Sequence, residues 1–173
     1  IDQPLLFVAG QYARFRFPFD IVDPNNKQHR TFTIISQPAE TTVSFMTRIT
    51  EPHSVFKHRL TELQVGDNML VDDPRGDVVL PSDPTVPLVF ACVGIGIAST
   101  ISILTQGRQQ QQRRSISLLY GVKMAEDKVF QDLIDTFPFT NYQTIVDPER
   151  ITAERIFTCA GGDSRTQFCI SGP

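Results

Sequence analysis

The first half of the chain consists of short segments in which apolar and polar residues alternate. Residues that favour turns separate these segments. Side chains of a strand point alternately to its two faces, so this alternation is typical of half-buried strands. We expect strands at residues 5–8, 11–17, 30–36, 42–50, 69–71 and 78–80, and one short helix at 54–63. Many short strands with frequent turns and a single helix predict a small antiparallel β-barrel.

The second half has longer apolar runs with helix-like stretches between them. Residues 88–93 form a continuous apolar run, and a glycine-rich turn separates it from an expected helix at 98–104. Further strands are expected at 115–120, 142–146 and 168–170, with an amphipathic helix at 130–137. Strands that alternate with helices in this way predict a parallel sheet covered by helices, which is a nucleotide-binding architecture.

The distribution of prolines indicates where the two halves meet. Nine of the twelve prolines lie within the first 87 residues and break that half into short segments. We therefore expect two domains, at residues 1–84 and 85–173. The predicted fold class is α+β two-domain, with an antiparallel β-barrel followed by an α/β parallel-sheet domain.

Charge and histidine spacing exclude two classes of function. The formal net charge is −3 and no basic residues cluster on one face, which argues against a nucleic-acid partner. The three histidines lack metal-ligand spacing with each other or with cysteines, so we expect no metal site.

The cysteines and the longest apolar runs bear on the cellular compartment. Cys92, Cys159 and Cys169 form no C-x-x-C pair, and their odd number argues against a secreted disulfide framework. No apolar run approaches the roughly 18 to 20 residues of a membrane-spanning helix, and no signal-peptide pattern opens the chain. We expect no membrane segment in this chain and a cytoplasmic location, or the cytoplasmic face of a membrane if a further domain is attached.

One short motif lies on the third expected strand. Arg30-Thr31-Phe32-Thr33 follows Gly10-Gln11-Tyr12 by about twenty residues. Residues two apart on a strand share a face, so Arg30 and Phe32 should point one way and the two threonines the other. The pair of motifs resembles the G-Q-[YF] strand and the R-x-[YF]-[ST] flavin motif of ferredoxin-NADP-reductase-like proteins.

That resemblance implies a role for each residue of the motif. The Arg of the family binds the flavin phosphate, a task that suits a permanently charged, bidentate donor. The aromatic residue packs on the isoalloxazine or ribitol side, and the Ser or Thr approaches flavin N5. These roles carry over to Arg30, Phe32 and Thr33, with Thr31 inside the motif and Thr33 as a catalytic residue.

Three further segments fit the same family. Residues 50–60 resemble its second phosphate segment, with Thr50, Ser54 and the Val55 backbone as candidates at a helix start. Residues 93–99 resemble its G-x-G-x-x-P loop, in which glycines let the backbone approach a pyrophosphate. The loop candidates are Gly94, Gly96 and Ile97, while Ile95 and Ser99 depart from the usual Thr and Pro. Lys123, just past the next strand, is a candidate for the adenosine ribose, and the choice between NADH and NADPH stays open.

The last residues resemble the C-G-P motif of the family. In Cys169-Ile170-Ser171-Gly172-Pro173, Ser171 takes the place of the Cys that lies beside the nicotinamide in the family. The resemblance makes Ser171 a catalytic candidate and adds Gly172 and Pro173 to the cofactor-binding residues. Family members also carry an opening barrel strand and elements after this motif, so we expect the chain to be N- and C-terminally incomplete.

Two functions are compatible with these motifs. The first is a flavin-dependent oxidoreductase that passes a hydride from NADH or NADPH to bound FAD, with FMN the less expected flavin, and then electrons to an acceptor. The acceptor would be a redox protein or an attached redox domain. The second is a non-catalytic flavin-binding sensory or interaction module, because Ile95, Ser99 and Ser171 all depart from the family pattern within one site.

Overall fold

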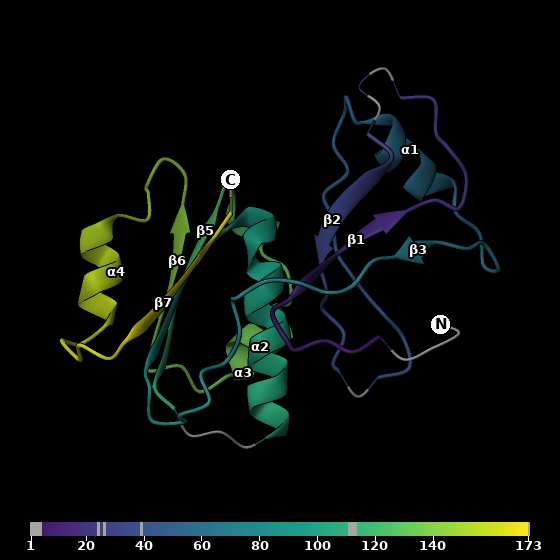
Figure 1. Cartoon of the computed structure of the whole chain (residues 1–173). Coiled ribbons are helices and arrows are strands. Elements are labelled where there is room, and N and C mark those ends of the chain that lie inside the picture. The colour runs from purple at the N-terminus through teal and green to yellow at the C-terminus, as the bar shows by residue number, and fades with distance from the viewer. Residues whose placement is uncertain (1–4, 24, 26, 39, 111–113, 173) are drawn as a thin grey trace.

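The computed structural model describes residues 5–23, 25, 27–38, 40–110 and 114–172, which form two domains (Figure 1). In the first domain, strands β1 (Tyr12–Arg16), β2 (His29–Thr33) and β3 (Leu70–Val71) form an antiparallel sheet in the order β2-β1-β3. Helix α1 (Val55–Glu62) packs on it. In β1, Ala13 and Phe15 are buried and the other residues are exposed, as the alternation predicts.

Three expected strands of this domain are wrong, because residues 5–8, 42–50 and 78–80 are not in strands. The segment 42–50 meets the sheet at a single bridge between Phe45 and Ile34. Its ladder stops there because the Ser36 hydroxyl, in place of a strand carbonyl, accepts the hydrogen bond from the Ser44 N–H at 3.0 Å. The Val79 N–H turns back to the Asp77 carbonyl, so it is not available to a neighbouring strand. Among the described residues, the antiparallel sheet therefore has three strands.

The second domain confirms the expected parallel sheet. Its strands β4 (Leu88–Val93), β5 (Ile116–Val122), β6 (Asn141–Val146) and β7 (Gln167–Ser171) are all parallel, in the order β6-β5-β4-β7. The two central strands are buried on both faces, which explains their continuous apolar sequence. Helices α2 (Ile97–Gln109) and α3 (Gln131–Thr136) lie on one face and α4 (Ala153–Cys159) lies on the other (Figure 1). The 3-10 turns η1 (Gly94–Gly96) and η2 (Ala125–Asp127) follow β4 and β5.

Helix α4 was not predicted from the sequence. Its N-cap is Thr152, whose hydroxyl accepts a hydrogen bond from the Arg155 N–H at 3.3 Å. Ile151, Ile156 and Cys159 pack on the sheet and cover the buried side chains of Ala91, Leu119 and Ile145. The cap and these apolar positions are signals that the sequence does carry.

Helix α2 joins the two domains. Nine of its thirteen residues are buried, because one side faces the sheet and the other faces the first domain. The Ser102 hydroxyl accepts a hydrogen bond from the Gly10 N–H at 3.3 Å, and the Ser102 carbonyl accepts one from Gln37 Nε2 at 3.2 Å. Gly10 has φ +99, and a Cβ there would lie 1.9 Å from the Val78 carbonyl oxygen, so only glycine fits this approach.

The end of β7 packs closely against the start of α2. The Ser171 hydroxyl donates a hydrogen bond to the Gly96 carbonyl at 2.8 Å. A Cβ on Gly96 would lie 2.6 Å from the carbonyl carbon and oxygen of Ser171 and 2.7 Å from the Gly172 nitrogen. The absence of a side chain at Gly96 is therefore what lets these two segments touch.

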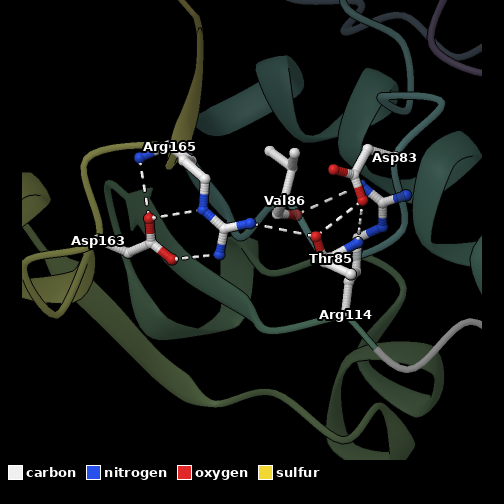
Figure 2. A network of polar contacts seen from close by, with 6 residues as sticks. All are labelled: Asp83, Thr85, Val86, Arg114, Asp163 and Arg165. Atoms are coloured by element: carbon white, nitrogen blue, oxygen red, sulfur yellow. Dashed lines mark hydrogen bonds and ion pairs between the residues drawn. The ribbon is translucent and has the colours of Figure 1, made fainter.

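A polar network holds the loop 81–87, which leads into β4 (Figure 2). Arg114, 8% exposed, donates hydrogen bonds to the Pro81 carbonyl at 3.0 Å and the Val86 carbonyl at 3.4 Å. Asp83 accepts hydrogen bonds from the Thr85 N–H and hydroxyl, both at 2.8 Å, and these bonds lower the pKa of its carboxyl group. Arg165 donates one hydrogen bond to the Thr85 hydroxyl at 3.2 Å and another to the Asp163 carboxylate at 2.8 Å. The network ties this loop to the start of β5 and to the turn before β7.

Among the described residues, no helix combines the length and apolar character that a membrane span requires. The three cysteines, all described, are free thiols. Burial raises the pKa of Cys92 to about 12, so its thiol stays protonated near neutral pH.

Replacing Arg114 should destabilise the fold through this network. Arg114→Ala leaves two loop carbonyls without their donor, which costs about 1–3 kcal/mol of unfolding free energy. Urea unfolding followed by circular dichroism measures the change. The matched control is the exposed Arg108, whose side chain donates one hydrogen bond, to the Thr136 hydroxyl. Arg108→Ala should change the unfolding free energy by about 0.5 kcal/mol or less. Equal effects of the two variants would contradict the structural role of Arg114.

Two glycine substitutions should change stability in opposite directions. Gly96→Ala forces a Cβ into the Ser171 backbone and should lower the unfolding free energy by about 1–3 kcal/mol. Gly107→Ala, inside α2 with no atom within 4 Å of the new Cβ, should raise it by about 0.5–1 kcal/mol because alanine favours the helix. The same urea titration tests both, and a stabilised Gly96→Ala variant would show that β7 does not approach the loop so closely.

Candidate functional site

A cleft of about 450 Å³ lies between the two domains. Strand β2, the segment 46–48 and Lys57 form its wall in the first domain. Residues 95, 96, 98 and 99 and the end of β7 form its wall in the second. In Figure 1 the start of α2 and the end of β7 lie at the same end of the parallel sheet, where parallel-sheet proteins usually bind ligands. The residues that line the cleft are Arg30, Thr31, Phe32, Thr33, Met46, Thr47, Arg48, Lys57, Ile95, Gly96, Ala98, Ser99, Ser171 and Gly172.

The charged side chains of the cleft are all positive. They are Arg30, Arg48 and Lys57, and no Asp or Glu lines the cleft. The guanidinium of Arg30 lies over the ring of Phe56, 5.3 Å from its centroid, and its Nη1 donates to the His29 carbonyl at 2.8 Å. A cleft with three cations and no carboxylate suits an anionic ligand such as a phosphate.

The residues of the flavin motif lie on β2 with the predicted alternation. Arg30 and Phe32 both contact the Phe56 ring, so they share one face of the strand. Phe32 is 7% exposed and stacks on Phe45 with ring centroids 4.4 Å apart. Most of the Phe32 ring is thus part of the core, and only a small part of this residue faces the cleft. Thr31 is exposed and Thr33 is half-buried.

The glycine loop and the last strand bring the second domain into the same cleft. Gly96, Ser171 and Gly172 line it, so the structure places them opposite the flavin motif, more than sixty residues away in sequence. Gly94 instead lines an adjoining cavity of about 190 Å³, whose wall also includes Tyr120 and Asp127. The two cavities share Met46, Thr47, Arg48 and Ile95.

Several predicted site residues lie outside the cleft. Ile97 is fully buried, and its N–H points back to the carbonyls of the preceding turn. Ser54 caps α1, with its hydroxyl accepting a hydrogen bond from the Lys57 N–H at 3.3 Å. Thr50 and Lys123 are exposed, Val55 is half-buried, and none of these three lines the cleft. Pro173 lies outside the described residues.

The sequence motifs missed Arg48 and Lys57, which reach the cleft from a loop and from α1. The sequence carries a signal for Lys57 alone. Lys57 is the third residue after the start-of-helix signal at Ser54, which places it in the first turn of α1.

The cleft contains no carboxylate, imidazole, thiol or phenol side chain that could act as an acid, base or nucleophile. None of its lining residues, all of which are described, is His, Cys, Asp, Glu or Tyr. The described residues also contain no group of three or more His, Cys, Asp or Glu that could hold a metal ion. The polar and cationic side chains of the cleft can bind and orient a ligand.

The chain matches curated reductase components over most of its length. The electron transfer component of anthranilate 1,2-dioxygenase from Acinetobacter baylyi is 29% identical over 133 residues, which is 76% of this chain and 36% of the relative. The electron transfer component of 2-halobenzoate 1,2-dioxygenase from Burkholderia cepacia is 26% identical over 86% of this chain and 44% of the relative. The chain thus spans less than half the length of these relatives. No family model matches it.

Solved structures share the fold. A ferredoxin NADP+ reductase from Neisseria gonorrhoeae with bound FAD and NADP has a TM-score of 0.74 and 20% identity, over 97% of this chain and 74% of that chain. The FAD/NAD-binding domain of a nitric oxide dioxygenase from Vibrio cholerae has a TM-score of 0.71 and 15% identity, over 98% of this chain and 87% of that chain. The fold of this chain is similar to that of ferredoxin NADP+ reductase, and its sequence is similar to reductase components, which agrees with the resemblance of its motifs.

Proposed function

We propose that this chain is the flavin- and nicotinamide-binding part of an NAD(P)H-dependent electron-transfer reductase. The observation that carries the proposal is the cleft, where the flavin motif of β2 faces Gly96, Ser171 and Gly172. Residues 1–84 would bind the flavin and residues 85–173 the dinucleotide, with the loop 81–87 between them. The cytoplasm, or the cytoplasmic face of a membrane, is the proposed location.

The residues present fit FAD and a nicotinamide dinucleotide. The cleft volume of about 450 Å³ falls within the usual range for small-molecule sites, and three cations in its wall suit phosphate groups. At Gly94 no atom lies within 4 Å of the place that a Cβ would take, so a ligand can approach the loop closely there. Bound FAD would supply the chemistry that the protein lacks, accepting two electrons as a hydride from NADH or NADPH and releasing them one at a time.

The protein side chains would then bind and align. Arg30 would hold a flavin phosphate, and the half-buried Thr33 would lie beside the reactive edge of the flavin. The hydroxyl of Ser171 is already committed to the Gly96 carbonyl at 2.8 Å. That bond fixes the end of β7, so Ser171 and Gly172 would position the nicotinamide as a rigid wall.

The electron acceptor would be a redox protein or an attached redox domain. Relatives named as electron transfer components of dioxygenases support this proposal, because such components act within multi-protein systems. An acceptor protein also fits a cleft that no His, Cys, Asp, Glu or Tyr lines, because the transfer of single electrons needs no proton-transferring side chain.

A second candidate is a non-catalytic flavin-binding module. Ile95 is 39% exposed in the wall that both cavities share, where the family carries a hydroxyl residue. The Ser171 hydroxyl is engaged with the backbone, which leaves it less able to adjust to a nicotinamide ring. These two observations favour weak dinucleotide binding with the flavin site intact.

Removal of the Arg30 guanidinium should weaken flavin binding. Arg30→Ala loses a charge-assisted hydrogen bond to a phosphate, so the FAD binding free energy should fall by about 1.5–3 kcal/mol. Quenching of flavin fluorescence on titration of the protein measures the dissociation constant. The control is Arg14→Ala on the exposed face of β1, which should bind FAD like the unaltered protein. Unchanged FAD affinity in Arg30→Ala would show that the phosphate lies elsewhere.

Anaerobic mixing with NADH or NADPH separates the two candidate functions. For a reductase, either dinucleotide should bleach the flavin absorption band of the FAD-loaded protein. A flavin band that persists with both, in protein that retains FAD, would favour the non-catalytic module. Protein that cannot be loaded with FAD or FMN would contradict both candidates.

A further inference from the structure

Lys57 is the one cation of the cleft that comes from a helix. It lies in the first turn of α1, and its N–H donates to the Ser54 hydroxyl at 3.3 Å. Its side chain is half-buried and lines the cleft together with Arg30 and Arg48. The Lys57 ammonium donates a hydrogen bond to the Arg48 carbonyl at 2.5 Å. The helix start thus fixes the backbone of Lys57, and this bond fixes its ammonium group.

Lys57 forms no ion pair with a described carboxylate. None of the ion pairs found among the described residues includes Arg30, Arg48 or Lys57. An ammonium has three N–H donors, and the bond to the Arg48 carbonyl uses one of them. Two donors remain for a ligand. An uncompensated cation that is held in position in this way is a typical binding group for a phosphate.

Arg30 meets the cleft from the other element, β2. Its Nη1 donates hydrogen bonds to the carbonyls of His29 at 2.8 Å and Lys27 at 3.4 Å. Its guanidinium group lies over the ring of Phe56. Phe56 is the residue just before Lys57, so Arg30 contacts the first turn of α1. The two cations therefore belong to one local structure, formed by β2 and the first turn of α1.

A purely structural role of Lys57 would also explain its position. Its bond to the Arg48 carbonyl ties the segment 46–48 to α1, and that segment lines both cavities. Loss of this tie would disturb the cleft for any flavin, with or without a phosphate. Loss of a phosphate ligand would weaken only the binding of phosphorylated flavins. The two roles thus predict different results for flavins that differ in their phosphates.

We propose that Lys57 is a second phosphate ligand, which holds the diphosphate of FAD together with Arg30. This inference rests on the proposed flavin-binding function. A diphosphate offers one phosphate to each cation, whereas the single phosphate of FMN satisfies one of them. Lys57 therefore favours FAD over FMN, and it contributes nothing to the binding of riboflavin beyond the shape of the cleft.

Flavin titrations of Lys57 variants test the proposal. The full chain is stripped of flavin and titrated with FAD, FMN and riboflavin, with flavin fluorescence as the readout. Lys57→Met should raise the FAD dissociation constant roughly 10-fold or more, because a charge-assisted hydrogen bond is lost. It should raise that of FMN less and leave riboflavin unchanged. Lys57→Arg should keep most of the FAD affinity, because it keeps the charge.

Two further variants serve as controls. Arg59→Met removes a positive charge from the same helix at an exposed position that pairs with Glu62, and it should bind FAD like the unaltered protein. Lys57→Gln keeps a donor for the Arg48 carbonyl but no charge, so it should lose FAD affinity as Lys57→Met does. Urea unfolding of each variant confirms that the fold persists, and if Lys57→Met does not fold, Lys57→Gln takes its place.

The remaining outcomes overturn the inference, each in a recognisable way. An equal loss of FAD and riboflavin affinity would show that Lys57 acts only as the tie to segment 46–48. Unchanged FAD binding in Lys57→Met, with weakened binding in Arg30→Ala, would reject the role of Lys57 and leave the proposed function standing. An unaltered protein that binds no flavin would remove the proposed function and this inference together.

Discussion

Helix α2 is buried along most of its length because the parallel sheet covers one side and the antiparallel domain covers the other. Its Ser102 bonds the backbone of Gly10 and the side chain of Gln37, so polar groups that would be costly to bury alone are paired across the domain boundary. The start of the same helix forms one wall of the cleft. The position of this helix therefore fixes how the two domains face each other, and the cleft exists only in that arrangement.

The backbone at the end of β7 depends on a second constraint, which is the missing side chain at Gly96. The Ser171 carbonyl lies so close to this position that any Cβ would displace it. A serine hydroxyl then completes the contact by bonding the Gly96 carbonyl. The hydroxyl of Ser171 thus has a physical role in this chain, because it makes a hydrogen bond that holds two segments together.

Much of this fold could be predicted from the sequence, because the central parallel strands are buried on both faces and appear as unbroken apolar runs. The alternation of Tyr12–Arg16 and the cap at Ser54 were equally direct signals. Strand predictions failed where side chains replaced ladder partners, as Ser36 does for Ser44. Such competition depends on the tertiary placement of a hydroxyl, which periodicity does not reveal. Helix α4 was missed although Thr152 caps it, because a seven-residue helix carries little periodic signal.

For the candidate site, the sequence motifs located the residues that lie on regular elements, Arg30 to Thr33 on β2 and Ser171 at the end of β7. Arg48 and Lys57 could not be assigned in the same way, because their place in the cleft depends on how a loop and α1 pack on β2. Phe32 shows the reverse case. Its motif position suggested a ligand contact, while its stacking on Phe45 makes it mainly a core residue.

The wall that the two cavities share, from Met46 to Arg48 with Ile95, has a thermodynamic consequence. A ligand that shifts these residues while filling one cavity changes the shape of the other, so the two binding equilibria are linked. Linkage is reciprocal, so a ligand in one cavity would change the affinity of the other cavity for its ligand by the same factor as the second ligand changes the affinity for the first. Occupancy of either cavity would thereby report on the other.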